Sequence, residues 1–160
     1  SLKGATLGLT DPGSTSGNLL PRVVFSKEVG VNLDDYFGKV VYTGSHELSS
    51  VAVVQGKVDA AFVATHRFAN VVDKGETKVD EVNVLWMSKP IPQDPFVYLG
   101  NLCPDIKANI RETFLGLKTQ PDAKKFLDNV KSNTFVEMRS EDYDIIRDLK
   151  KAKDEKKKGG

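Results

Sequence analysis

The sequence is poor in the side chains that hold metals or form covalent bridges. Its 160 residues include one cysteine, Cys103, and two histidines, His46 and His66. A single cysteine excludes an intramolecular disulfide, a cysteine-rich zinc site and a Cys-X-X-Cys redox motif. Two histidines without further ligands at metal-binding spacing do not indicate a metal site. We therefore expect no metal centre and interpret Cys103 as an inert packing residue.

A long apolar run and a strong excess of either charge are also missing. No hydrophobic stretch approaches the ~20 residues that a membrane-spanning helix needs. The formal net charge is +1, whereas a protein that lives on nucleic acid needs a concentrated basic face. With 39% hydrophobic and 28% charged residues, the composition is that of an ordinary soluble globular protein. We expect no nucleic-acid partner.

Motifs that would mark an enzyme or an export signal are absent as well. A P-loop needs Lys directly after its final Gly, but Asn18 follows Gly17, and no dinucleotide-binding glycine fingerprint occurs. No G-x-S-x-G elbow surrounds a serine that His46 could activate. No signal peptide precedes Ser1, so we expect a cytoplasmic protein or the folded part of a longer one, and a serine start favours the second.

The most informative stretch is the polar loop 10–18. It lies between an alternating apolar run at 5–9, typical of a strand, and a helical pattern of apolar residues. Ser14, Thr15 and Ser16 combine hydroxyls with backbone N–H groups that lack intrahelical partners at a helix start. Such a turn can hold a phosphoryl group. The same residue types also serve as purely structural N-caps, and both interpretations remain open at this point.

A second strand–turn–helix unit follows the first. The β-branched run 40–43 predicts a central strand, and Gly44-Ser45-His46 comes directly after it. Ser45 is a good N-cap, and Gly56 supplies a left-handed residue at the far end of the expected helix. His46 is therefore predicted in the first turn of that helix.

The alternation of strands and helices predicts an α/β fold with an open, mostly parallel sheet and helices on both faces. Two further strands are expected at 58–64 and 82–87, with a helix at 66–72 between them. In an open parallel sheet the strand-to-helix turns share the carboxyl edge, where ligands bind. The serine–threonine turn and His46 should therefore converge on one edge.

The chain changes character after residue 90. The three prolines within 90–95 can continue neither a helix nor a central strand. The divisions that we predict are an α/β lobe at 1–90, a hinge or crossover at 91–100, a C-terminal helical segment at 101–150 and a disordered charged tail at 151–160. Within these segments a short strand is expected at 96–99 and helices at 106–117, at 121–130 and from 140–142 onward.

Two family resemblances meet at the first loop. Residues 13–18, Gly-Ser-Thr-Ser-Gly-Asn, look like the FMN-phosphate loop of flavodoxins, which also follows a first strand. That resemblance would imply a flavodoxin-like, FMN-binding electron-transfer protein. It is confined to this one loop.

The second resemblance covers most of the chain. Six motifs occur in order, namely Lys3-Gly4, Asp11-Pro12-Gly13-Ser14-Thr15-Ser16-Gly17, Tyr36-Phe37, Gly44-Ser45-His46, Gly56-Lys57-Val58-Asp59-Ala60 and Ser88-Lys89-Pro90-Ile91-Pro92-Gln93-Asp94-Pro95. Together they are similar to the phosphate-, phosphite- and phosphonate-binding proteins of ABC transporters. The segment Asp142-Tyr143-Asp144 also resembles the C-terminal end of that family.

This resemblance implies a two-lobed periplasmic binding protein that closes on an oxyanion, with neither enzymatic activity nor a cofactor. Ser14, Thr15 and Ser16 would hold the phosphoryl oxygens, and His46 would be a further donor. Asp94 would take the amino group of an aminophosphonate. The implied partners are a small oxyanion (phosphonate, phosphite or phosphate) and a transporter permease, and the implied location is periplasmic or membrane-anchored outside the cytoplasm.

Members of that family have a further lobe before the segment that resembles Ser1 onward. The present chain resembles a second lobe followed by the C-terminal helices. We expect the face that the missing lobe would cover to favour self-association.

Overall fold

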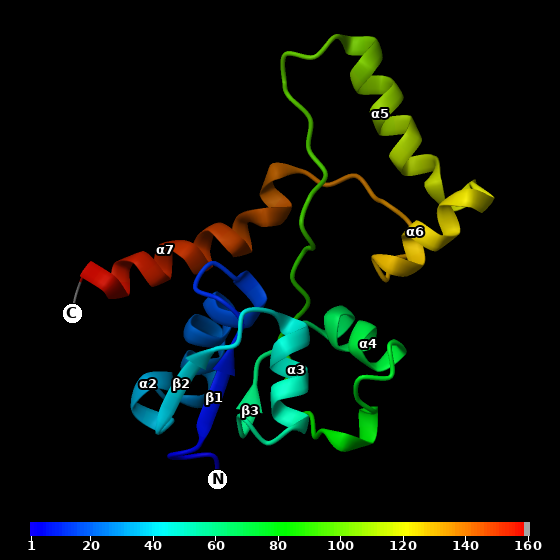
Figure 1. Ribbon diagram of the computed structural model, residues 1–160. Helices are drawn as coiled ribbons and strands as arrows, with labels where there is room; N and C mark the ends of the chain where they lie inside the picture. The colour runs from blue at the N-terminus through cyan, green and yellow to red at the C-terminus, as the bar shows by residue number, and fades with distance from the viewer. Residues whose placement is uncertain (159–160) are drawn as a thin grey trace. The chain divides into compact units, whose positions relative to one another are not determined.

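The computed structural model describes residues 1–158, which divide into two compact units (Figure 1). Unit 1 comprises Ser1–Ile91 together with the C-terminal helix α7 (Asp144–Lys158), and unit 2 is Pro92–Tyr143. Helix α7 thus belongs to unit 1 and continues to Lys158, where the sequence analysis predicts a disordered tail. The last two residues of that predicted tail lie outside the described residues. The hinge role of 91–100 stays a prediction.

Unit 1 is built on a three-stranded sheet in the order β2-β1-β3 (Figure 1). The central strand β1 (Thr6–Leu9) pairs in parallel along its whole length with β2 (Lys39–Tyr42). On its other side, only two residues of β1 pair with the short parallel strand β3 (Ala60–Ala61). All three carboxyl ends therefore share one edge, and the predicted α/β class with an open parallel sheet is confirmed.

Helices cover the sheet and follow the strands in the predicted order. Those of unit 1 besides α7 are η1 (Thr15–Leu19), η2 (Pro21–Phe25), α1 (Ser26–Val29), α2 (Leu33–Tyr36), α3 (His46–Val54), α4 (Thr65–Asp73) and η3 (Val79–Glu81). Leu7 and Leu9 on one face of β1 form a core with Leu33 and Phe37. The terminal helix α7 buries Leu149 against the first helical segment.

The first helical segment, 15–29, contains two π-helical stretches, η1 and η2, before it ends as α1. Pro21 lies well inside this segment, at the start of η2. Pro21 has no N–H to donate to the Gly17 carbonyl four residues earlier, and the Thr10 N–H donates to that carbonyl instead, at 3.2 Å. Wider turns next to Pro21 thus keep the helix continuous.

Three strand predictions are corrected by the structure. The predicted strand 58–64 is reduced to Ala60–Ala61, and neither 82–87 nor 96–99 is a strand. Residues 82–87 have no pairing partner in the described chain, and Val84, Leu85 and Met87 are exposed. Their side chains are mostly apolar, but a strand also needs a neighbouring ladder of N–H and C=O groups.

Trp86 is what holds the 82–87 segment to unit 1. Its ring lies edge-on to the rings of Phe25 and Phe62, and its Nε1–H donates to Glu28 at 2.8 Å.

Unit 2 consists of short helices joined by extended chain. Its elements are α5 (Pro104–Gly116), η4 (Leu117–Thr119), η5 (Pro121–Ala123), α6 (Lys124–Asn129) and η6 (Ser140–Tyr143). Four aromatic rings, those of Phe96, Phe114, Phe126 and Phe135, contact one another. Cys103 is exposed, so its predicted packing role is wrong. None of the helices within residues 1–158 has both the length and the apolarity to cross a bilayer.

Candidate functional site

The first loop of the site turns sharply after β1 and caps its own helix. The Asp11 side chain accepts from the Gly13 N–H at 2.8 Å, and the Asp11 carbonyl accepts from the Ser14 N–H at 3.2 Å. The Ser14 hydroxyl then accepts from the Gly17 N–H at 3.0 Å, which makes Ser14 the N-cap. The Ser14 hydroxyl oxygen therefore has the capping role, as one of the two interpretations predicts. Its hydroxyl hydrogen remains available to donate to another group.

Gly17 holds this loop against the end of β1. A Cβ added to Gly17 would lie 2.2 Å from the Thr10 hydroxyl oxygen, which is far inside a van der Waals contact. Thr10 itself is buried, and its hydroxyl has no hydrogen-bond partner among the described residues. Only glycine allows the serine–threonine turn to approach the strand this closely.

The second loop of the site follows β2 and starts α3. Ser45 caps α3 by accepting from the Leu48 N–H at 3.0 Å, as predicted, and His46 is the first residue of the helix. The Gly44 N–H donates to the Thr10 carbonyl at 2.7 Å. The Thr43 hydroxyl lies 2.5 Å from that of Ser49, which ties the turn to the body of α3. Both loops are thus fixed to the same end of the sheet.

The structure brings Ser16 and His46 into direct contact. The Ser16 Oγ lies 3.0 Å from the His46 Nε2, although the two residues are 30 positions apart in the sequence. On the other side of the ring, the Ala64 N–H donates to the His46 Nδ1 at 3.0 Å. Ala64 follows β3, so one residue from the carboxyl end of each strand meets at the imidazole. The predicted convergence of the two turns is therefore observed.

Thr15 and Ser16 supply further groups that remain able to donate, in addition to the Ser14 hydroxyl. Their N–H groups lie in the first turn of the helical segment, where no earlier carbonyl of the helix can accept from them. The Thr15 hydroxyl makes no hydrogen bond to another described residue. Donors of this kind, at the positive end of a helix, are suited to an anion.

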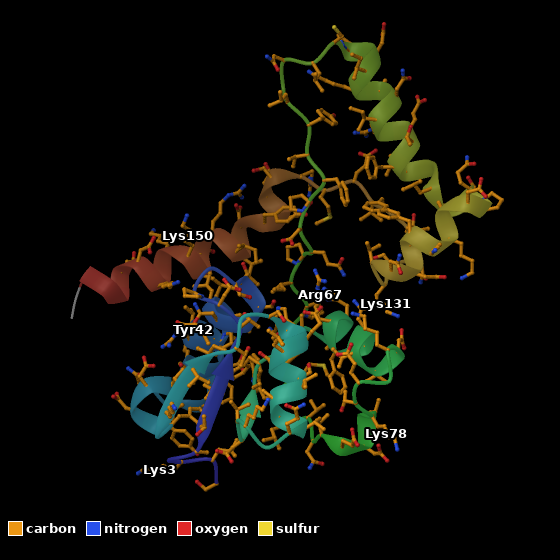
Figure 2. The ribbon with its side chains drawn as sticks, in the orientation of Figure 1. Lys3, Tyr42, Arg67, Lys78, Lys131 and Lys150 are labelled. Carbon is orange, nitrogen blue, oxygen red and sulfur yellow. The ribbon has the colours of Figure 1, made fainter. Side chains whose placement is uncertain are left out.

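Burial sets the charge state of the site histidine. It lowers the pKa of His46 below the usual value of 6.5, and the positive charges of His66 and Arg67 act in the same direction. The Glu47 carboxylate opposes this shift but is itself paired with Arg67, labelled in Figure 2, at 3.5 Å. The ring is therefore neutral at pH 7.

Asp94 belongs to unit 2, while the other predicted site residues belong to unit 1. Its side chain is exposed, and its predicted role stays a prediction. The sequence analysis missed the Ala64 backbone N–H, because only its position after a strand, and no side chain, points to it.

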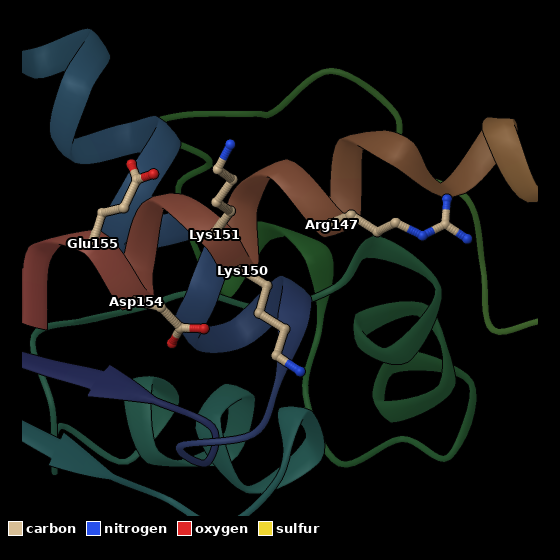
Figure 3. Close-up of a pocket in the computed structure, with 5 residues that line it drawn as sticks. All are labelled: Arg147, Lys150, Lys151, Asp154 and Glu155. Atoms are coloured by element: carbon tan, nitrogen blue, oxygen red, sulfur yellow. The ribbon is translucent and has the colours of Figure 1, made fainter.

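Two hollows lie on unit 1, and one of them borders the first loop at Pro12 and Asn18. One, of about 420 Å³, is lined by Asn18, Arg22, Asp34 and Tyr42 among others, and Arg22 is already paired with Asp34 at 2.7 Å. The other, of about 430 Å³, is formed by charged side chains of α7 alone and shares no residue with the two loops (Figure 3). No group of three or more potential metal ligands occurs within residues 1–158.

A parallel sheet with polar donors gathered at its carboxyl edge is the arrangement typical of ligand-binding lobes in α/β proteins. Comparison with known proteins makes this assignment specific. The chain belongs to the family of periplasmic substrate-binding proteins of ABC phosphonate transporters, whose family model matches residues 1–143. This is a family of transport proteins and not of enzymes. Membership decides against the flavodoxin-like alternative for the 13–18 loop.

Curated relatives carry related names. The phosphonates-binding periplasmic protein of Escherichia coli (strain K12) is 30% identical over 128 residues, which cover 80% of this chain and 37% of that protein. The phosphate-import protein PhnD of Mycolicibacterium smegmatis is 28% identical over 118 residues, covering 69% of this chain and 36% of that protein. The chain thus spans little more than a third of the length of these relatives.

Solved structures show the same fold. The binding protein component of an ABC phosphonate transporter from Pseudomonas aeruginosa has a TM-score of 0.78 at 29% identity, covering 93% of this chain and 49% of that one. PhnD1 from Prochlorococcus marinus, solved in complex with methylphosphonate, has a TM-score of 0.83 at 22% identity, with coverages of 96% and 58%. The second likeness, at this low identity, supports the fold alone.

Proposed function

We propose that this chain carries the oxyanion-binding turns of an ABC importer's substrate-binding protein, with Ser14, Thr15, Ser16 and His46 as donors to a phosphoryl group. The observation that carries the proposal is the 3.0 Å contact between Ser16 and His46, which joins the two predicted turns at one edge of the sheet. The family is named for phosphonate, and phosphite and phosphate share the same tetrahedral oxygens.

The donors of the proposed site carry no formal positive charge. Hydroxyl and N–H groups at the start of a helix stabilise an anion through directed hydrogen bonds and the helix dipole. Hydrogen bonds to an ionised acceptor are roughly twice as strong as those between neutral groups. Discrimination among oxyanions then depends on groups around the fourth substituent of phosphorus, and we propose Asp94 as the acceptor for the amino group of an aminophosphonate.

The remaining parts of the proposal follow from the family. The partner is the permease of an ABC transporter, and the location is periplasmic or membrane-anchored outside the cytoplasm. The chain spans 37% of the Escherichia coli relative, and we propose that these residues form one wall of a two-lobed cleft. We therefore expect binding on the order of millimolar, about −4 kcal/mol. The exposed apolar residues Phe96, Val97 and Leu99 should favour self-association at high concentration.

The binding proposal is tested by calorimetric titration with phosphate, phosphite, methylphosphonate and 2-aminoethylphosphonate. Thr15→Ala and Ser16→Ala should each lose about 1.5–3 kcal/mol of binding, an affinity loss of about 10- to 150-fold. Asn32→Ala is the matched control, because Asn32 caps α2 outside the site. It should lose about 1 kcal/mol of stability and no affinity.

The opposite pattern would refute the proposal. If the two site variants lose stability as the control does while the affinity for every oxyanion is unchanged, the turn is only a cap. A loss of 2-aminoethylphosphonate binding alone in Asp94→Asn would assign the amino-group contact. An equal loss for methylphosphonate would reject that contact.

A further inference from the structure

Helix α7 begins where the match to the family model ends. That match covers residues 1–143 and α7 is Asp144–Lys158, so membership of the family assigns this helix no role. We propose that α7 is a detachable helix that docks on the first helical segment through Leu149 and fixes the first loop through Lys153. Docking of α7 is then coupled to binding of an oxyanion, and this second part rests on the function proposed above.

One narrow apolar stripe docks α7 on unit 1. Leu149 is buried, and Ile146, one turn earlier, is half-buried. Both pack in one cluster with Leu19 and Leu20 of the first helical segment (Figure 1). Most of the remaining side chains of α7 are charged. A helix held by so few apolar contacts can open locally while the sheet of unit 1 stays folded.

The second contact of α7 is polar and reaches the first loop. Lys153 lies one turn beyond Leu149 and is half-buried, and its ammonium group donates to the Pro12 carbonyl at 3.2 Å. The Asn18 side-chain amide donates to the same carbonyl at 2.8 Å. A carbonyl oxygen has two lone pairs, so these two donors fully occupy it. All three residues line the hollow of about 420 Å³, away from the Ser16–His46 contact.

The other anchor of the Pro12 carbonyl belongs to the body of unit 1. Asn18 is buried, and its Oδ1 accepts from the Arg22 Nε at 3.0 Å and from the Tyr42 hydroxyl at 3.4 Å. Arg22 is in turn paired with Asp34 on α2 at 2.7 Å. The Asn18 anchor therefore stays in place when α7 opens, whereas the Lys153 anchor leaves with the helix.

The order of the first loop links α7 to the ligand. The Ser14 N–H donates to the Asp11 carbonyl at 3.2 Å, which closes a turn that contains Pro12. A turn that is already ordered loses less conformational entropy when an anion binds to it. By thermodynamic linkage, the bound anion then favours the docked helix by the same factor. Lys153 is thus a positioning residue that acts through Pro12.

The docking of α7 is tested by amide hydrogen exchange, followed by NMR on the full chain without ligand. Leu149→Ala should speed exchange in residues 146–153 by at least about 10-fold, because it removes the buried side chain of the apolar stripe. The amides of Ser14, Gly17 and Leu19 should also exchange faster, and those of β1 should not. Ile145→Ala is the matched control on the same helix, since Ile145 is 43% exposed, and it should change none of these rates.

Two results would overturn the docking proposal. If Leu149→Ala speeds exchange in β1 as much as in α7, the helix is an inseparable part of the core. If it leaves the amides of Ser14, Gly17 and Leu19 unchanged, α7 does not order the first loop.

The polar contact is tested by three lysine variants in the same measurement. Lys153→Met removes the ammonium group but keeps a helix-forming side chain, and it should speed exchange at Ser14 and Gly17 by about 3- to 10-fold. Lys151→Met removes the same charge from an exposed position and should have no such effect. Lys153→Arg retains a cationic donor and should restore slow exchange. Equal effects of Lys153→Met and Lys151→Met would reject the contact with Pro12.

The coupling is tested by adding methylphosphonate to the unchanged protein. Exchange should become slower at Ser14 and Gly17 and also in residues 146–153, and Lys153→Met should bind methylphosphonate about 3- to 10-fold more weakly in calorimetry. Slower exchange in the loop without any change in α7 would overturn the coupling. If methylphosphonate slows exchange nowhere, the proposed function fails and the coupling fails with it, whereas the ligand-free measurements still decide whether α7 detaches.

Discussion

Unit 1 and unit 2 differ most in how much apolar surface each can bury. Among the residues whose burial the structure describes, unit 1 contains nine buried apolar side chains, namely Leu7, Leu9, Leu19, Leu20, Leu33, Phe37, Val58, Val71 and Leu149, whereas unit 2 contains Leu127. A sheet offers two faces on which helices can pack, and unit 1 uses the sheet in this way. Unit 2 has helices without a sheet. The elements of unit 1 thus specify a core, whereas those of unit 2 leave most of their apolar side chains partly in water.

The aromatic cluster of unit 2 illustrates this contrast. The Phe96 ring contacts those of Phe114 and Phe135 at centroid distances of 4.8 and 5.2 Å. Phe96 nevertheless remains 61% exposed. The geometry of a ring pair contributes about 0.5–1.5 kcal/mol of stability beyond the burial of its area. This contribution is too small to replace the stability that a fully buried ring would provide.

The largest effect is expected from truncating the core of unit 1. Leu9 on β1 is completely buried, and Leu9→Ala should lower the free energy of unfolding by about 2–5 kcal/mol because it removes packed methyl groups and leaves a cavity. Leu99→Ala is the matched control in unit 2, since Leu99 is 70% exposed. It should change stability by less than about 0.5 kcal/mol. Urea unfolding of both variants makes the comparison, and equal losses would contradict the contrast between the units.

The two units should also differ in their tolerance of a methyl group at a glycine. Gly17→Ala should destabilise unit 1 by about 1–3 kcal/mol, because the new methyl group would overlap the Thr10 side chain. Gly116→Ala in unit 2 meets nothing within 4 Å at the end of α5 and should be neutral or stabilising by about 0.4–1 kcal/mol. Thermal unfolding distinguishes the two, and a tolerated Gly17→Ala would mean that the first loop can move away from β1.

Removal of the buried Thr10 hydroxyl should change stability less than the substitutions above, and should raise it. Its oxygen has no hydrogen-bond partner in the described chain, so the isosteric Thr10→Val should raise stability by about 1 kcal/mol. Thr113→Val in unit 2 removes an exposed hydroxyl that donates to the Asn109 carbonyl, and should change stability within about ±0.5 kcal/mol. Chemical denaturation checks both. A destabilised Thr10→Val would show that this hydroxyl contributes to the native state.

The smallest expected effect is a dependence of unit 1 on mildly acidic pH. Burial lowers the pKa of His46, so below the unfolded value of 6.5 the unfolded chain binds more protons than the folded one. The stability that His46 contributes is therefore present above pH 6.5 and is lost as the pH falls through the folded pKa. Both histidines lie in unit 1. Between pH 7.5 and 5.5, His46→Gln should flatten the fall in melting temperature and His66→Gln should retain more of it. The reverse ranking would assign the effect to His66.

Local sequence determined the parts of this protein that depend on near neighbours. The caps at Ser14 and Ser45 and the left-handed Gly56, with a φ of 66°, follow from residues within four positions of each other. Helix α2 could also have been predicted from local sequence, because Asn32 caps it and two aspartates occupy its first turn. It was missed because its four residues are too few to show a helical period of apolar side chains.

Long-range contacts determine which extended segments become strands and which polar groups come together. Residues 82–87 and 96–99 have strand-like side chains, but pairing requires a neighbour that lies far away in the sequence. The meeting of Ser16, His46 and the Ala64 N–H likewise depends on β1, β2 and β3 ending at one edge. The parallel order of the strands predicts that edge. A hydrogen bond from a backbone N–H to a ring nitrogen, however, requires the two groups to be placed to within a few tenths of an ångström. Such a distance is set by the packing of the whole unit, which no short stretch of sequence contains.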